Sequence, residues 1–227
     1  ETVLTVATAT TTVQVGLTTE QVAQIQIRQQ EKQRVLGIAP NFYVTYIPDA
    51  APLTAKQKFQ LAFRSVSDPV TLLGVGALAG MHQAANDYVE LGQEAGGYGK
   101  RFSAAYATLV TGAFIDDVVL ASLLKQDPRY FYQGTGTTRS RLLHALSHAV
   151  VRKGDDGRWQ PNYSGIIGSF ASSGLSSLYY PENDRTAGLV VQNALVGIAG
   201  RAVGGVLQEF VLRKFTSHAN TQVAPHP

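Results

Sequence analysis

The sequence has no cysteine among its 227 residues. A disulfide framework, a thiolate metal site and a cysteine nucleophile are therefore all excluded. Charge is also scarce, because Asp, Glu, Lys and Arg make up only 15% of the chain, against roughly 25% in an average soluble domain. The 19 Lys and Arg residues are scattered and the net charge is only +3, so no dense basic patch indicates nucleic-acid binding.

The beginning of the chain also lacks the features of a targeting segment. The first residues, ETVLTV, carry no positive charge and no long apolar run, so we expect that any export signal was removed or lies upstream. The absence of cysteine fits an oxidising compartment such as the bacterial cell envelope. Localisation has to be inferred from the rest of the chain.

The order of sequence patterns predicts a mainly α fold. Residues 1–15 alternate apolar residues with threonine, which is typical of one β-strand. From Thr18 to Gly37 the Gln-rich pattern predicts a polar helix or an extended arm, and the proline-rich residues that follow predict an extended segment, so we expect residues 16–52 to serve as an arm and linker. Residues 53–217 show helical periodicity, and residues 218–227 predict a flexible tail. We therefore expect a bundle of about five to six helices with Gly- and Ala-rich packing faces, preceded by the strand and the arm.

Capping residues mark where two of the helices begin. Thr54 is a good N-cap for an amphipathic helix that ends at Val66. Asp68 and Pro69 supply an N-cap and a first-turn proline for the next helix. The remaining predicted helices span 100–125, 138–153, 162–180 and 185–215.

One pattern suggests an internal duplication. A short helix rich in small residues, a loop and a long helix occur over 69–125 and again over 162–215. The two segments share little residue identity. They are either two copies of one helical hairpin or two similar hairpins of the kind that any helical bundle contains.

Several segments are apolar enough to suggest a membrane, although polar residues interrupt each of them. They cover 69–81, 102–115, 164–180 and 186–208. Small residues recur there at helical spacing, by which membrane helices pack closely, although soluble bundles use this pattern too. These packing positions are Gly76, Gly80, Gly165, Gly168, Gly197, Gly200 and Gly204. Low charge, the amphipathic helix and tyrosines at helix ends favour membrane association, with lipid and further copies of the chain as partners.

Four titratable residues inside apolar segments are candidates for buried ion pairs. A carboxylate inside an apolar helix is costly unless it is paired. Asp116 and Asp117 therefore need a partner, which His82 or Arg201 can supply. The alternative is a solvent-facing Asp pair at a helix kink. In lipid the same four residues would form a polar path.

A histidine pair is the only arrangement that suggests metal chemistry. His144 and His148 lie four residues apart, so both imidazoles can face one way and share a metal. No glutamate stands between them as a general base, and the nearest carboxylates, Asp155 and Asp156, follow in a turn. The alternative places both histidines on the polar face of a basic helix. No catalytic residue and no cofactor are predicted.

Five motifs and the closing helix carry a family resemblance. The motifs are QQEKQRVLGIAPNFYVTY, LTAKQKFQLAFRSVSDP, GYGKRFSAAY, LLKQDPRYFYQGTG and RWQPNYSGIIGSFASSGLSSLYYP. Together they cover about 30–215 and resemble a family of uncharacterised bacterial envelope proteins. In that family the helical body often follows a carboxypeptidase-regulatory-like β-sandwich, a binding or spacer module, and residues 1–15 resemble its last strand. The resemblance implies a compartment and a domain order, and it implies no activity.

These features favour a non-catalytic structural or assembly protein of the bacterial envelope. We expect a membrane-associated helical bundle that forms a homo-oligomer or joins a larger complex. A first alternative is a metal-binding protein or hydrolase that uses His144 and His148. A second is a small-solute or lipid conduit, whose polar path would be formed by His82, Asp116, Asp117 and Arg201.

Overall fold

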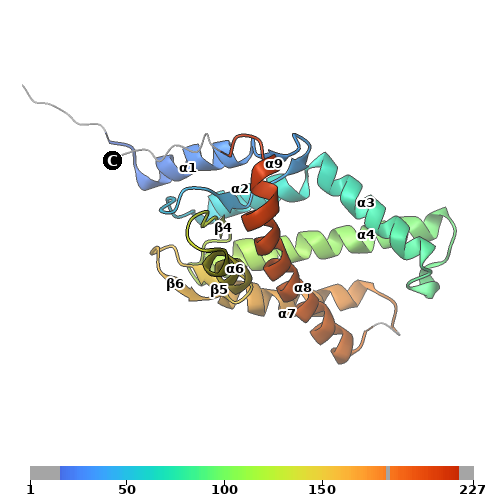
Figure 1. Cartoon of the computed structure of the whole chain (residues 1–227). Coiled ribbons are helices and arrows are strands. Elements are labelled where there is room, and N and C mark those ends of the chain that lie inside the picture. The colour runs from blue at the N-terminus through green and yellow to red at the C-terminus, as the bar shows by residue number, and fades with distance from the viewer. Residues whose placement is uncertain (1–15, 183–184, 220–227) are drawn as a thin grey trace, which may run out of the picture.

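The computed structural model describes residues 16–182 and 185–219, which form a mainly helical protein (Figure 1). The predicted fold class is therefore confirmed. The strand predicted for residues 1–15 and most of the predicted tail lie outside the described residues. Within these ranges the longer helices are α1 (Thr19–Gln30), α2 (Ala55–Val66), α3 (Pro69–Ala84), α4 (Ala95–Gly112), α6 (Thr138–Ser147), α7 (Tyr163–Ser176) and α8 (Ala187–Leu207).

Two of these helices continue beyond their α-helical part. α4 runs through a π-helical segment, Ala113–Leu120, into α5 (Ala121–Leu123). α8 likewise runs through the π-helical segment Gln208–Leu212 into α9 (Arg213–Phe215). The short strands are β1 (Arg34–Val35), β2 (Ala39–Pro40), β3 (Val44–Thr45), β4 (Tyr130–Phe131), β5 (Val151–Lys153) and β6 (Trp159–Pro161).

The predicted N-caps position the helices as expected. The Thr54 hydroxyl accepts a hydrogen bond from the Gln57 backbone N–H at 3.3 Å, and the Gln57 side chain returns to the Thr54 backbone. The Asp68 carboxylate accepts from the Val70 backbone N–H at 3.0 Å. Both contacts satisfy N–H groups that a helix start leaves without an intrahelical partner.

The prediction that residues 16–52 form a connector outside the core is wrong, although the helix that the Gln-rich stretch allowed does form. Thr18 caps α1, whose Ala23 and Ile27 are fully buried. These two side chains form a hydrophobic core cluster with Phe42, Leu53 and Leu61. The sequence suggested a connector because α1 is rich in glutamine, yet Gln26 is buried and accepts a hydrogen bond from the Ala51 N–H at 2.9 Å.

The prediction of one helix over 138–153 is also wrong at its C-terminal end. α6 ends at Ser147, and Val151–Lys153 form β5, which pairs antiparallel with β6. The β-branched pair Val150 and Val151 disfavours continuation of the helix and suits a strand. A second pairing, parallel between β3 and β4, fixes the arm to the body through Val44 opposite Tyr130.

Two helical hairpins extend from this base, α3 with α4 and α7 with α8 (Figure 1). The long helices of the two hairpins share structural features although they share little residue identity. Each long helix contains a π-helical segment near its C-terminal end, and π-helical geometry is rare. Asp117 and Glu209 lie equally far from the first residues of the two helices, and each pairs with an arginine. These parallels favour a duplicated hairpin over two unrelated ones.

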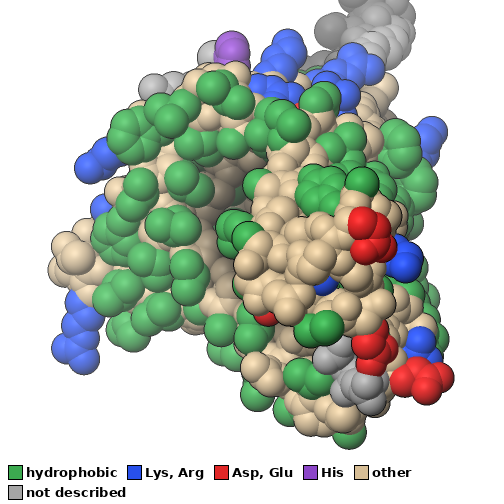
Figure 2. All heavy atoms as spheres, turned by 90° about the vertical axis from the view of Figure 1, so that its right-hand side faces the viewer, with side chains coloured by type: hydrophobic (Ala, Val, Ile, Leu, Met, Phe, Trp, Pro, Cys, Tyr) green, Lys and Arg blue, Asp and Glu red, His purple; other side chains and the backbone are tan. Residues whose placement is uncertain are grey.

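Polar and apolar side chains are distributed unusually in the described chain. The largest fully buried side chains are mostly polar or charged, among them Arg129, Lys58 and Glu209. Large apolar side chains on the hairpins instead point outward, with Leu73 72% exposed and Val196 63% exposed. Figure 2 shows hydrophobic side chains along both edges of a hollow in the face at the right of Figure 1. The hairpins thus present apolar surfaces that no other part of residues 16–182 and 185–219 covers.

Candidate functional site between the helical hairpins

A cavity of about 540 Å³ lies between the two hairpins, and all four of their helices contribute to its lining. Its polar wall comes from α7, where Ser169, Ser172, Ser173 and Ser176 occupy positions i, i+3, i+4 and i+7. That spacing puts all four serines on one helix face. We call this space the serine cavity. The sequence showed these serines only as small residues for helix packing, so the cavity was not predicted.

An ion pair between Arg201 and Asp116 lies in the wall of the serine cavity. Arg201 also donates from Nη1 to the Ser169 hydroxyl at 2.8 Å. Asp116 is only 7% exposed, and its Oδ1 atom has no hydrogen-bond partner among the described residues. Gly168 makes this arrangement possible, because a Cβ at that position would overlap the Asp116 carboxylate. Of the two partners that the sequence predicts for Asp116, the structure therefore shows Arg201.

A second ion pair lies beside the first. Arg152 donates from Nη2 to Asp117 at 3.2 Å and from Nη1 to the Ser164 hydroxyl at 2.8 Å. Arg152 is 2% exposed, so this pair is held inside the protein. The adjacent acids Asp116 and Asp117 thus point to different partners, which excludes the solvent-facing Asp pair that the sequence left open.

His82 lies in the lining of the serine cavity but does not pair with Asp116. Its Nδ1 atom is 2.7 Å from Asp87, near the end of the first hairpin. The prediction that His82 can partner the buried carboxylates is therefore wrong, because the loop after α3 supplies a nearer acid. Tyr88 and Tyr180, one from each hairpin, also line the cavity, with ring centroids 4.9 Å apart.

A second, smaller cavity of about 310 Å³ lies further along α8. Arg201 lines both cavities, so its side chain stands between them. One face of α8 passes from one cavity to the next, through Asn193, Gly197, Arg201 and Gly204, and on to Gln208 in the π-helical segment. This face is polar or small on a helix that is otherwise apolar.

The histidine pair does not form a metal centre. His144 Nε2 lies 2.8 Å from the Phe131 carbonyl oxygen, and the His148 ring packs edge-on against Tyr130 at 5.0 Å. Burial, and then the nearby Arg152 and Arg201, lower the pKa of His148 to about 3. Among the residues that the structure describes, no three His, Asp or Glu side chains are grouped to hold a metal ion.

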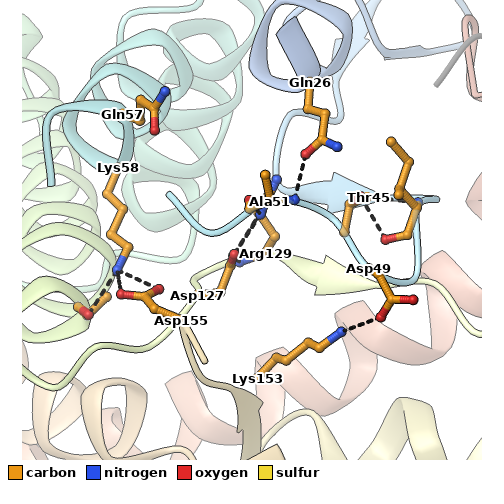
Figure 3. A network of polar contacts seen from close by, with 12 residues as sticks. Gln26, Thr45, Asp49, Ala51, Gln57, Lys58, Asp127, Arg129, Lys153 and Asp155 are labelled. Atoms are coloured by element: carbon orange, nitrogen blue, oxygen red, sulfur yellow. Dashed lines mark hydrogen bonds and ion pairs between the residues drawn. The ribbon is translucent and has the colours of Figure 1, made fainter. Parts of the chain in front are cut away.

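The placement of both histidines on a polar helix face is wrong as well. The outward side of α6 carries Leu142, Leu143 and Leu146, and the histidines turn toward β4. The acids of the following turn are also engaged elsewhere. Lys58, on α2, donates to Asp155 at 2.9 Å and to the Ala121 carbonyl (Figure 3).

Figure 3 shows a polar network that anchors the arm to the helical body. The fully buried Arg129 forms an ion pair with Asp127 at 2.6 Å and donates to the Ala51 carbonyl at 2.7 Å. Lys153 approaches Asp49 at 3.6 Å from the other side. Because every charge in this network has a partner that belongs to the fold, we assign it to stability and not to chemistry.

The predicted glycine face on α8 is only partly used within the chain. A Cβ at Gly197 would meet the Ser169 hydroxyl at 3.5 Å, while Gly200 and Gly204 have no atom nearby. The close crossing is at Gly205, where a Cβ would overlap the Ala145 carbonyl oxygen of α6. Within one chain, the prediction of a tight crossing at Gly200 is therefore wrong. Successive residues of an α-helix face directions about 100° apart, so Gly205 faces α6 while Gly200 and Gly204 do not.

The other predicted packing glycines differ in how closely they are approached. A Cβ at Gly76 would meet the Tyr98 hydroxyl at 3.3 Å, so α4 packs tightly there, while the nearest atom to Gly80 is 4.0 Å away. Gly165 is enclosed by the Asn162 side chain that caps α7.

Two helices are long and apolar enough to cross a membrane, Ala95–Leu123 and Ala187–Phe215. They are the long helices of the two hairpins, with their π-helical segments included. Comparison with protein-family models, curated proteins and solved structures finds no match for this chain. The resemblance to an envelope protein family stays a prediction, and functional inference depends on the geometry described above.

Proposed function

We propose that this chain is a non-catalytic assembly protein of the bacterial envelope, held in the membrane by its two helical hairpins and associated with further copies or a larger complex. One observation carries the proposal: the apolar stretches of the two long helices are only 17% and 11% buried within the protein. The core helix of a soluble protein is mostly buried. These helices therefore need an apolar environment that the described part of the chain does not provide.

Lipid supplies that environment at lower cost than water does. Burying apolar surface contributes roughly 25 cal/mol per Å², and large exposed apolar patches mark membrane or protein contacts. The outward side chains on α8 include Val191, Leu195, Val196 and Val203, all at least 46% exposed. The one charged side chain of α8, Arg201, turns inward and pairs with Asp116.

The envelope location and the assembly role have separate support. The absence of cysteine and the resemblance of the motifs over about 30–215 favour the envelope. Gly200 leaves open space beside α8, which would let the backbone of another helix approach closely.

Membrane fractionation tests the proposal. We expect the protein to stay in the membrane pellet at high salt and in alkaline carbonate, and to require detergent for release, because salt screens charges without weakening apolar burial. Val203→Asp places a charge on the outward face and should weaken retention, whereas Thr138→Asp, at an exposed position outside both candidate spans, is the matched control. Quantitative release of the unchanged protein by salt or carbonate would contradict membrane anchoring.

A second function, a conduit for small solutes, is favoured by the position of Arg201 between the two cavities. Together the cavities follow a polar face of α8 from Asn193 to Gln208. Swelling of protein-containing liposomes in glycerol tests this function. Swelling no faster than in protein-free liposomes would rule it out and would leave the assembly role intact.

A further inference from the structure

We propose that the serine cavity is a binding site for a neutral, hydroxyl-rich ligand of the size of one or two sugar rings. The inference goes beyond the assembly role and does not depend on it, because the cavity is lined by helices of a single chain. Its volume of about 540 Å³ falls within the roughly 300–1,000 Å³ typical of small-molecule sites.

The cavity offers polar groups that the fold leaves available. Ser173 and Asn193 line it, and neither side chain has a hydrogen-bond partner in the part of the chain that the structure describes. Ser173 is half-buried and Asn193 is exposed, so both side chains are accessible to a ligand in the cavity. Each can therefore form a hydrogen bond with a polar occupant without giving up a contact of the fold.

The charges of the wall argue for a neutral ligand. Arg201 is paired with Asp116, and His82 contacts Asp87, so the lining offers no single unpaired charge. A charged ligand would lose its hydration shell without meeting a free counter-ion, which is unfavourable in an enclosed site. Hydroxyl groups can both donate to and accept from the serines and Asn193, and they carry no such cost.

Part of the lining matches the less polar faces of a sugar ring. Tyr88 and Tyr180 lie with their rings 4.9 Å apart, and Leu78 and Leu189 extend the apolar part of the lining. A sugar ring presents C–H groups on its faces and hydroxyls around its edge. A cavity lined by both serines and tyrosines can therefore contact both kinds of group.

The absence of cysteine makes the proposal directly testable. In Ser173→Cys the introduced thiol is the only one in the chain, and its rate of labelling by a water-soluble maleimide reports access to the cavity. The protein is held in a detergent with a polyoxyethylene headgroup. We expect glucose or maltose, at about 1–100 mM, to slow labelling at least about fivefold. Thr138→Cys, on the exposed start of α6, is the matched control and should be unaffected.

A second pair of variants separates binding from indirect effects. Asn193→Leu, in the Ser173→Cys background, should raise the sugar concentration needed for protection about tenfold, because it removes one hydrogen bond. Gln192→Leu, at the neighbouring exposed position that does not line the cavity, should leave protection unchanged.

The source of the sugar is distinguished by the detergent. Protection by octyl glucoside micelles and not by free glucose or maltose would identify a lipid headgroup as the ligand. Three results would overturn the proposal. They are a Ser173→Cys thiol that is not labelled at all, labelling that no sugar slows, and labelling that phosphate or citrate slows while sugars do not.

Discussion

The close crossing between α6 and α8 gives the sharpest stability prediction. Gly205 is buried, and a Cβ added to it would overlap the Ala145 carbonyl oxygen and lie 3.2 Å from the carbonyl carbon. A backbone carbonyl cannot rotate away as a side chain can, so Gly205→Ala should force α6 and α8 apart. Overpacking of this kind costs about 1–3 kcal/mol. A loss of 2 kcal/mol corresponds to a Tm lower by roughly 4–8 °C for a domain of this size.

Gly204→Ala is the matched control because the space beside Gly204 is open. There the same change should stabilise the helix by up to about 1 kcal/mol, the difference in helix propensity between the two residues. Thermal unfolding in detergent, followed by the fluorescence of the single tryptophan, Trp159, measures both effects. A Gly205→Ala variant as stable as the unchanged protein would refute the crossing and with it the packing of α6 on α8.

Three further predictions follow from the same structure. Arg201→Leu leaves Asp116 buried without its partner and should lower the free energy of unfolding, measured by chemical denaturation, by about 3–5 kcal/mol. The double variant Arg201→Leu with Asp116→Leu should recover part of this stability, and no recovery would contradict the ion pair. His148 titrates at about 3 in the folded protein and at 6.5 in the unfolded chain, so the unfolded state binds more protons in this window and stability falls as pH drops through it. His148→Gln should reduce this loss of stability at low pH, measured by unfolding at several pH values, whereas His144→Gln should leave the loss unchanged. Equal acid sensitivity in the unchanged protein and in His148→Gln would refute the lowered pKa of His148. Gly200→Leu should lower the oligomer size seen by light scattering if another copy packs on the open face of α8, and an unchanged size would exclude that face as an interface.

The sequence predicted the features that depend on local chemistry. The N-caps at Thr54 and Asp68 are confirmed because capping needs only the right side chain at a helix start. The partner of Asp116 was narrowed to two residues because a carboxylate in an apolar helix requires compensation. Arg201 was one of them, and the structure brings the two together.

Features set by tertiary packing were missed. α1 looks like a connector because its glutamines are polar, and only tertiary packing provides partners for them, as the arm does for Gln26 and α2 does for Gln24. The α7 serines fit helix packing as well as a cavity wall, and the distinction depends on where α8 lies. Adjacent glycines at 204 and 205 look alike in sequence, yet only Gly205 faces α6.

The environment of the outward face of α8 tests the central proposal most directly. Leu195→Cys places a single thiol at a position that is 55% exposed, and a nitroxide label attached there reports its surroundings in liposomes. We expect dissolved oxygen to reach this label more readily than a water-soluble nickel complex does, because oxygen concentrates in hydrocarbon. The label on Thr138→Cys, outside both candidate spans, should show the opposite preference. A Leu195→Cys label that the nickel complex reaches as readily as it reaches the label on Thr138→Cys would contradict the placement of this helix in the membrane.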